Sequence, residues 1–208
     1  MKALSSGIEQ LTANLKGIIF DLDNTLLSSR LDFGKIRAAI NCPKSEDIIA
    51  FIERLPTKAQ RDDAMARVVA FEIEDALHSN WLEYAKDTVQ SFAKCGLQMA
   101  IVTRNCRDAA LLKMRENQVP INVLLSREDA PPKPAPDALV MVANQWSIDP
   151  QQLAYVGDYK YDVDAANNAG MLSVLLASNP TPDYASSADL VFSDWKGLHQ
   201  YFEKHLTA

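Results

Sequence analysis

Apolar and polar positions follow one another in blocks along this chain, and six short apolar runs stand out. They cover residues 17–21, 98–103, 121–126, 153–158, 172–177 and 189–193. Their length and their β-branched or aliphatic side chains are typical of strands that are covered on both faces. Helical patterns separate the runs, and strands that alternate with helices form parallel βαβ units with right-handed crossovers. The pattern therefore predicts an α/β fold with a doubly wound, Rossmann-like parallel sheet.

One interval in this pattern is too long for a single crossover helix. Residues 24–97 separate the first two predicted strands, and they carry three helical patterns, at 45–55, 58–80 and 82–96. The last pattern ends at Gly96, a typical C-cap glycine, and we expect it to cover the sheet as the ordinary crossover. The two earlier patterns predict a small helical insert above the end of the first strand.

Apolar positions in the two insert helices repeat at helical spacing. The first helix opens on Ser45 and two acids, a signal for a helix N-terminus, and places Ile48, Ile52 and Leu55 on one face. In the second helix the predicted apolar stripe lies opposite the charged positions and consists of Met65, Val69, Ile73, Ala76 and Leu77.

The position of the insert suggests its role, because open α/β sheets bind ligands at the strand ends. We interpret residues 28–80 as a helical cap domain over that site. Residues 1–27 and 81–208 then form the α/β core. An extra helical layer with a purely structural role is the alternative.

Composition and charge argue against several classes of protein. The 208 residues are 48% hydrophobic, which is enough for a full core, and the formal net charge of −6 without a basic cluster disfavours nucleic-acid binding. No apolar run approaches the roughly 20 residues of a membrane helix, and the N-terminal residues lack the apolar segment of a signal peptide. Three scattered cysteines without CxxC spacing predict reduced thiols. We expect a cytoplasmic protein that binds neither membrane nor nucleic acid.

Polar side chains follow the first, second and fourth predicted strands directly, and a lysine lies in the loop after the third. These candidate site residues are Asp21, Asp23, Thr103, Asn105, Lys133, Asp158 and Asp162. Each one alone has an ordinary explanation as a turn, cap or surface residue. Because the carboxyl ends of parallel strands form the ligand crevice of an open sheet, we expect these residues to converge.

The residue types in this group point to phosphate chemistry. Clustered carboxylates without basic partners favour a divalent cation, and an all-oxygen set suits Mg²⁺, which also binds phosphate. Thr103, the backbone amides around it and Lys133 can donate hydrogen bonds to a phosphate. Alternation along the strand places Asp21 and Asp23 on the same side. One carboxylate can then attack phosphorus while the other handles the proton of the leaving oxygen.

The series of motifs resembles the haloacid dehalogenase superfamily of phosphohydrolases. The matching segments are "DLDNT" (21–25), Thr103 in "IVTRN", Lys133 in "PPKPAPD", and "GDYKYD" (157–162) running into "VDAANNAGM". The insert between the first two motifs is similar to the cap of the phosphoglycolate phosphatase-like subfamily. Two mild departures are Asn24, where glycine is common, and Tyr159, where serine is common.

The resemblance implies a role for each carboxylate. Asp21 would be the nucleophile that forms an aspartyl-phosphate, and also a ligand of Mg²⁺. Asp23 would be the general acid–base, with its backbone carbonyl on the metal. Asp158 would ligate Mg²⁺, and Asp162 would orient the lysine or a metal-bound water.

The resemblance also implies what the remaining residues do. Thr103 would hold the phosphoryl oxygens with help from Asn105, and Lys133 would neutralise the nucleophile and the transferring group. The expected protein is thus a Mg²⁺-dependent phosphatase acting on a small phosphorylated metabolite. The sequence names neither that metabolite nor an oligomeric state.

Other functions stay open at this point. A phosphomutase could use the same aspartyl-phosphate, whereas a dehalogenase is disfavoured because it needs neither Asp23 nor a metal cluster. A receiver-type phospho-acceptor switch and a non-catalytic interaction protein are the non-enzyme alternatives. Arg30, Lys35 and Arg37 are candidates for binding an anionic substrate tail, or they are ordinary surface charges.

Overall fold

The structure is a computed structural model that describes residues 2–177 and 180–206. Its centre is a six-stranded sheet in the order β3-β2-β1-β4-β5-β6, in which all pairs of neighbouring strands are parallel. The strands are β1 (Gly17–Phe20), β2 (Gln98–Val102), β3 (Val123–Leu125), β4 (Leu153–Gly157), β5 (Leu172–Leu176) and β6 (Leu190–Phe192). Each coincides with one of the six apolar runs. The predicted doubly wound parallel sheet is confirmed.

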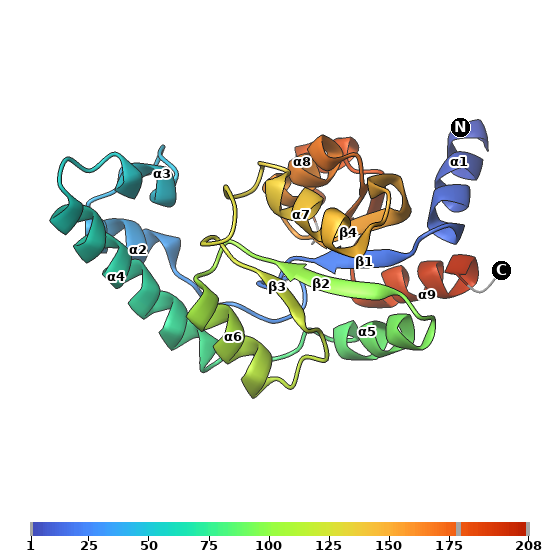
Figure 1. Cartoon of the computed structure of the whole chain (residues 1–208), viewed down its shortest axis with the longest axis horizontal. Helices are drawn as coiled ribbons and strands as arrows, with labels where there is room; N and C mark the ends of the chain where they lie inside the picture. The colour runs from blue at the N-terminus through green and yellow to red at the C-terminus, as the bar shows by residue number, and fades with distance from the viewer. Residues whose placement is uncertain (1, 178–179, 207–208) are drawn as a thin grey trace.

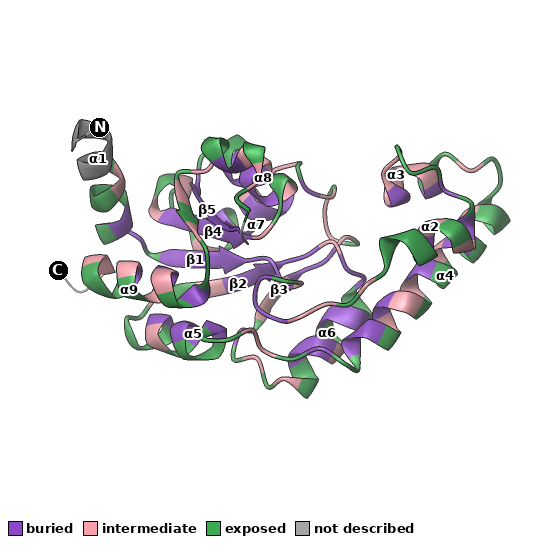
Figure 2. Ribbon diagram, turned by 180° about the vertical axis from the view of Figure 1, so that it is seen from behind, coloured by how far each residue is buried: buried purple, intermediate pink, exposed green. Residues whose placement is uncertain are grey.

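Helices cover both faces of this sheet (Figure 1). They are α5 (Ala85–Lys94), α6 (Arg107–Glu116) and α9 (Trp195–Leu206) on one face, and α7 (Asp137–Trp146) and α8 (Lys160–Ala169) on the other. The helix α1 (Lys2–Ala13) lies beyond the end of the sheet and contacts α9, and short 3₁₀ helices are at Pro150–Gln152 and Asp183–Ser187. Alternate residues of β1 serve opposite faces: Ile18 and Phe20 pack in the cluster with α5, α6 and α9, and Ile19 packs with α7 and α8. The strands β1, β4 and β5 are therefore buried along their whole length, as Figure 2 shows.

The long interval after β1 forms the predicted helical insert. It contains α2 (Phe33–Ile40), α3 (Ile48–Glu53) and α4 (Lys58–Ala76), which lie beyond the end at which β1 stops (Figure 1). These helices share an apolar cluster of their own, built from Ile36, Ile40, Cys42, Ile48, Ile52, Ala64 and Val68. Asp47 caps α3 by accepting from two backbone amides, so the helix begins after Asp47 and not at the predicted Ser45.

The predicted apolar stripe of α4 is wrong in part. Ala76 is buried, but Leu77 is 60% exposed and the other members are only partly buried. The buried row is instead Ala64, Val68, Glu72 and Asp75 with Ala76. Two carboxylates lie in it because the core supplies a buried cation for each, and a hydrophobicity pattern cannot detect such pairing. Ala64 and Val68 pack against α2 and α3, and the C-terminal part of the row packs α4 along α6.

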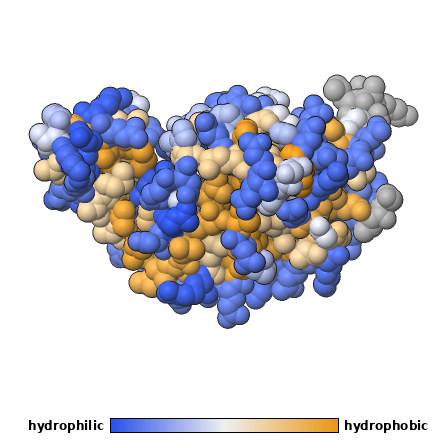
Figure 3. Space-filling model, in the orientation of Figure 1, coloured by the Kyte–Doolittle hydropathy of each residue, from blue (hydrophilic) through white to orange (hydrophobic). Residues whose placement is uncertain are grey.

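Within the described residues, no helix is both long enough and apolar enough to cross a membrane. Hydrophilic side chains are spread over the core and the insert, and a notch separates the outer part of the insert from the core (Figure 3).

Candidate active site

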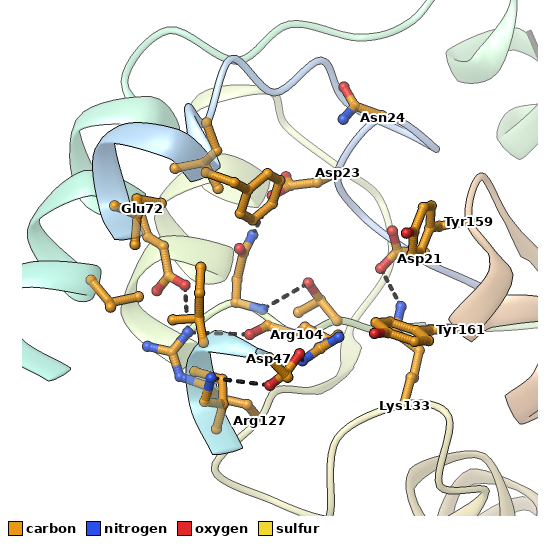
Figure 4. A pocket seen from close by; sticks show the side chains of 18 of the residues that line it. Asp21, Asp23, Asn24, Asp47, Glu72, Arg104, Arg127, Lys133, Tyr159 and Tyr161 are labelled. Carbon is orange, nitrogen blue, oxygen red and sulfur yellow. Dashed lines mark hydrogen bonds and ion pairs between the residues drawn. The ribbon is translucent and has the colours of Figure 1, made fainter. Parts of the chain in front are cut away.

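A cavity of about 590 Å³ lies between the strand ends and the insert. It is lined by all seven residues that the sequence predicts for the site: Asp21, Asp23, Thr103, Asn105, Lys133, Asp158 and Asp162. The opposite wall is made by side chains of α2, α3 and α4. The expected convergence at the strand ends is therefore present in the structure, in the part seen in Figure 4.

The sheet order explains why these residues meet. The chain enters the sheet at β1 and continues to β2 on one side and to β4 on the other, so the crevice opens beyond β1. Asp21 follows β1 and its backbone amide donates to Val156 O at 2.9 Å. Gly157 allows the next loop to fold tightly, because a Cβ there would lie 2.3 Å from the Asp162 side chain.

Lys133 is the centre of the buried charges. Its Nζ donates to Asp21 Oδ1 at 2.7 Å, to Asp162 Oδ1 at 2.6 Å and to the Tyr155 hydroxyl at 2.8 Å. The Tyr155 hydroxyl in turn donates to Val102 O at 3.0 Å. The sequence does not predict that Tyr155 contacts Lys133, because Tyr155 lies within an apolar run whose pattern indicates only a buried strand.

Three carboxylates lie close to this one lysine, which pairs with two of them, Asp21 and Asp162. Oxygens of Asp21, Asp158 and Asp162 all lie within 4.8 Å of one another, close enough to hold a metal ion. Burial raises the pKa of Asp21 to about 8, with Asp162 and Asp158 adding to the shift and Lys133 opposing it. Burial and the charge of Asp162 likewise raise the pKa of Asp158 to about 7. The group has one positive charge for three carboxylates, and its all-oxygen donors fit a hard divalent cation.

Asp23 lies in a separate polar environment beside this group. Its Oδ1 is paired with the Lys113 ammonium, and its Oδ2 accepts from Asn105 Nδ2 at 2.9 Å. Burial raises the pKa of Asp23, and Lys113 opposes the shift. The Lys113 side chain is 0% exposed and also contacts Asp75 Oδ2 of α4 at 2.7 Å. Sequence reasoning missed Lys113, because a lysine within a helix is usually a surface residue.

The loop after β1 accounts for one departure from the expected motif. Asn24 has a φ of +56°, in the left-handed region where glycine is favoured and asparagine is among the best tolerated alternatives. Its Oδ1 accepts from Ser29 N at 3.1 Å and ties the loop to the start of the insert. Asn24 therefore preserves the turn that a glycine would make.

Comparison with known proteins agrees with this arrangement. The sequence profile of the haloacid dehalogenase-like hydrolase family matches residues 29–176. The chain belongs to this family. The predicted resemblance is confirmed, and so is the prediction that the protein is an enzyme of the hydrolase type.

Relatives of this hydrolase include proteins named as phosphatases. An uncharacterized hydrolase of Saccharomyces cerevisiae is 30% identical over 173 residues, 80% of this chain and 79% of the relative. A phosphoglycolate phosphatase of Escherichia coli is 26% identical over 203 residues, 77% of this chain and 81% of the relative. The crystal structure of a hydrolase from Pseudomonas syringae shares the fold, with a TM-score of 0.75, 19% identity and coverage of 91% and 98%.

The cationic side chains proposed for an anionic substrate tail do not converge in this hydrolase. Arg30 and Lys35 are not among the described residues that line the cavity. Arg37 does line it, but its guanidinium donates to Pro43 O at 2.9 Å and to Glu46 O at 2.5 Å. The Arg37 guanidinium thus organises the loop between α2 and α3.

Proposed function

We propose that the protein is a Mg²⁺-dependent phosphatase that hydrolyses a small phosphorylated metabolite through an aspartyl-phosphate on Asp21. The observation that carries the proposal is the buried group of Asp21, Asp158 and Asp162 around a single Lys133. Such a group is short of positive charge until a cation binds, and a bound cation attracts phosphate. Its position at the sheet crevice of a haloacid dehalogenase-like hydrolase supports a catalytic role over a structural one.

Asp21 and Asp158, with the backbone carbonyl of Asp23, would hold the Mg²⁺. The ion supplies charge that offsets these carboxylates and the phosphoryl oxygens when it is bound. Lys133 holds Asp21 Oδ1, so Oδ2 is the oxygen that attacks phosphorus. Asp162 accepts hydrogen bonds from Lys133 Nζ at 2.6 Å and from the Tyr159 backbone amide at 3.0 Å, which suits a positioning role.

The reaction then divides between two carboxyl groups. Asp21 Oδ2 forms a bond to phosphorus, the ester P–O bond breaks, and Asp23 gives its proton to the leaving oxygen. In the second step a water attacks phosphorus, passes a proton to Asp23, and the bond between Asp21 and phosphorus breaks. Burial favours the protonated form of Asp23 that the first step needs, since it raises the pKa of that carboxyl.

Thr103 and Asn105 are placed to receive the phosphoryl group. Thr103 is 5% exposed and lies at the end of β2, and its Oγ1 accepts from Asn105 N at 3.2 Å. The Asn105 side chain orients Asp23. We therefore assign Thr103 and the amides beside it to the phosphoryl oxygens, and the Asn105 side chain to positioning the acid–base group.

We also propose that residues 28–80 act as a cap, with 1–27 and 81–208 as the catalytic core. The insert contributes one wall of the cavity, and its Asp47 reaches Arg104 of the core at 2.6 Å. Two buried ion pairs, Glu72–Arg127 and Asp75–Lys113, hold α4 against the core. The cap is thus anchored along α4, and α2 and α3 carry the surface that faces a substrate.

Phosphate release from aryl and alkyl phosphates is the direct test of this proposal. Activity should disappear in EDTA and return with Mg²⁺. In Asp23→Asn, an aryl phosphate with an acidic phenol should still phosphorylate Asp21, because that leaving group needs no proton, and the phosphoryl-enzyme should persist. Mass spectrometry after acid quenching should place the phosphate on the Asp21 peptide.

Asp21→Asn is the matched control and should yield no phosphoryl-enzyme. Full turnover in EDTA, or phosphate on a residue other than Asp21, would contradict the proposal.

A further inference from the structure

The wall of the cavity that the insert provides carries an apolar set of side chains beside polar and charged ones. The apolar set is Leu31, Phe33, Ile36, Ile48, Ile49 and Val68, and the polar set is Arg37, Lys44, Ser45, Glu46, Asp47 and Glu72. Phe33, the first residue of α2, is 60% exposed although it is a large aromatic side chain. Across the cavity, Tyr159 and Tyr161 lie beside Asp21 and Lys133 (Figure 4), with their ring centroids 5.3 Å apart. Aromatic and aliphatic side chains therefore lie in the same cavity as the place where phosphate would bind.

The cations of the cavity are already paired. Lys133 belongs to the carboxylate group, Arg127 is paired with Glu72, and Arg104 donates to Asp47 Oδ2. Arg37, as described above, donates to backbone carbonyls. Among the described residues that line the cavity, only the exposed Lys44 is a cation without a carboxylate or carbonyl partner.

The balance of charge has a consequence for the substrate. Among the described residues, seven acidic and five basic side chains line the cavity. A bound Mg²⁺ therefore offsets the excess of negative charge, and the phosphoryl group then adds negative charge again. A second anionic group on the leaving alcohol would lose water beside Asp47 and Glu72 without gaining a buried cation. An apolar group in the same position would instead be removed from water against Phe33.

Resting on the phosphatase assignment above, we propose that the substrate is a phosphate monoester whose leaving alcohol carries no second negative charge and has an apolar body. Phe33 and its apolar neighbours on the insert bind that body. Asp47 sets the charge preference, because it occupies the Arg104 guanidinium that could otherwise pair with a substrate carboxylate.

Asp47 can be changed without loss of its structural role. Its Oδ1 caps α3 by accepting from Ile49 N at 3.0 Å and from Ala50 N at 3.2 Å, while Oδ2 binds Arg104. Asparagine caps helices as well as aspartate does. Asp47→Asn therefore keeps the cap and removes the charge that holds Arg104.

Three alkyl phosphates test the preference: 2-phenylethyl phosphate, ethyl phosphate and phosphoglycolate, each with Mg²⁺. They share the phosphoryl group and differ in apolar surface and charge. We expect kcat/KM to be highest for 2-phenylethyl phosphate and lowest for phosphoglycolate, with an overall range of at least about tenfold. Faster hydrolysis of phosphoglycolate overturns this inference alone. Phosphate release from none of the three overturns the phosphatase assignment, and this inference with it.

Variants identify the residues behind the preference. Phe33→Ala should lower kcat/KM for 2-phenylethyl phosphate about tenfold and affect ethyl phosphate much less. The control is Leu77→Ala, since Leu77 is also 60% exposed but lies outside the cavity. A loss that is equal for both substrates, or equal in both variants, overturns the assignment of Phe33.

The matched test of charge is Asp47→Asn. It should raise kcat/KM for phosphoglycolate about tenfold relative to ethyl phosphate, because Arg104 becomes free to bind the carboxylate. Asp63→Asn removes the same charge from an exposed α4 ion pair with Arg67 and should change neither substrate. An unchanged ratio in Asp47→Asn, or an equal gain in Asp63→Asn, overturns the role of Asp47.

Discussion

Two groups of buried charges lie close together in this protein and are built differently. The site cluster holds three carboxylates around one lysine and consists of Asp21, Asp158, Asp162 and Lys133. The anchor cluster has one cation for each of its carboxylates and consists of Glu72, Arg127, Asp75 and Lys113, of which Lys113 also contacts Asp23 of the site. The first joins strand ends, and the second fastens α4 to the core.

The pKa values reflect this difference. Burial raises the pKa of Asp21 to about 8 and that of Asp158 to about 7, because Lys133 does not compensate for three carboxylates. Burial also acts on Asp75, but hydrogen bonds from Lys113 and from the Arg30 amide outweigh it and lower the pKa of Asp75. A balanced cluster is what a structural contact requires. An unbalanced one is relieved by a further cation or by a bound proton, so the imbalance itself points to a functional site.

The largest expected effect concerns the anchor cluster. Lys113→Met leaves Asp75 and Asp23 buried without their cation, and removing one partner of a buried pair costs about 3–5 kcal/mol. The free energy of unfolding, measured in urea, should fall by that amount. Lys160→Met removes a half-exposed lysine from a surface pair with Asp164 and should cost less than about 1 kcal/mol. Equal stability of the two variants would show that the anchor cluster does not hold the fold.

In the site cluster the corresponding change should act mainly on the rate. Lys133→Met should lower kcat about 10²–10³-fold at saturating Mg²⁺, the usual range for one preorganised donor at a reacting group. Lys133→Arg should recover little, since a planar guanidinium replaces a compact ammonium that contacts three partners. Steady-state phosphate release measures both variants. A near-normal kcat in Lys133→Met would remove Lys133 from the catalytic group.

The smallest effect is a dependence of stability on pH in the metal-free protein. The folded pKa of Asp158, about 7, lies above its ordinary value of 3.8, so the native state binds more protons than the unfolded state between these pH values. This carboxyl therefore makes the free energy of unfolding fall as pH rises from about 4 to 8. Asp158→Asn should show a shallower fall in urea titrations at several pH values. A steeper fall in the variant would contradict the assigned shift.

Much of the core and the site could be predicted because the information is local. Each strand is a run of apolar residues, and the candidate side chains follow it directly, so the parallel sheet itself brings Asp21, Thr103 and Asp158 together. The predicted helix at 82–96 is confirmed as α5, with Gly96 at a φ of +76° beyond its end. Neither α1 nor α2 is among the predicted helices.

The anchor cluster could not be predicted for a physical reason. Glu72 of α4 meets Arg127 after β3, and Asp75 meets Lys113 on α6, so each pair joins residues far apart in the chain. A charged side chain usually faces solvent, and only the folded chain shows that these four do not. For the same reason the predicted apolar stripe of α4 is displaced, and it includes Leu77, which is exposed in the structure.

Stability with and without Mg²⁺ at pH 8 tests most directly whether the site cluster is completed by a cation. Mg²⁺ at 100 times its dissociation constant should raise the free energy of unfolding of the unaltered protein by about 2.7 kcal/mol. Glu72→Gln, which alters the anchor cluster and leaves Asp21, Asp158, Asp162 and Lys133 in place, should keep this response although it is less stable, and Asp158→Asn should lose it. No response of the unaltered protein to Mg²⁺, or an undiminished response in Asp158→Asn, would contradict the account.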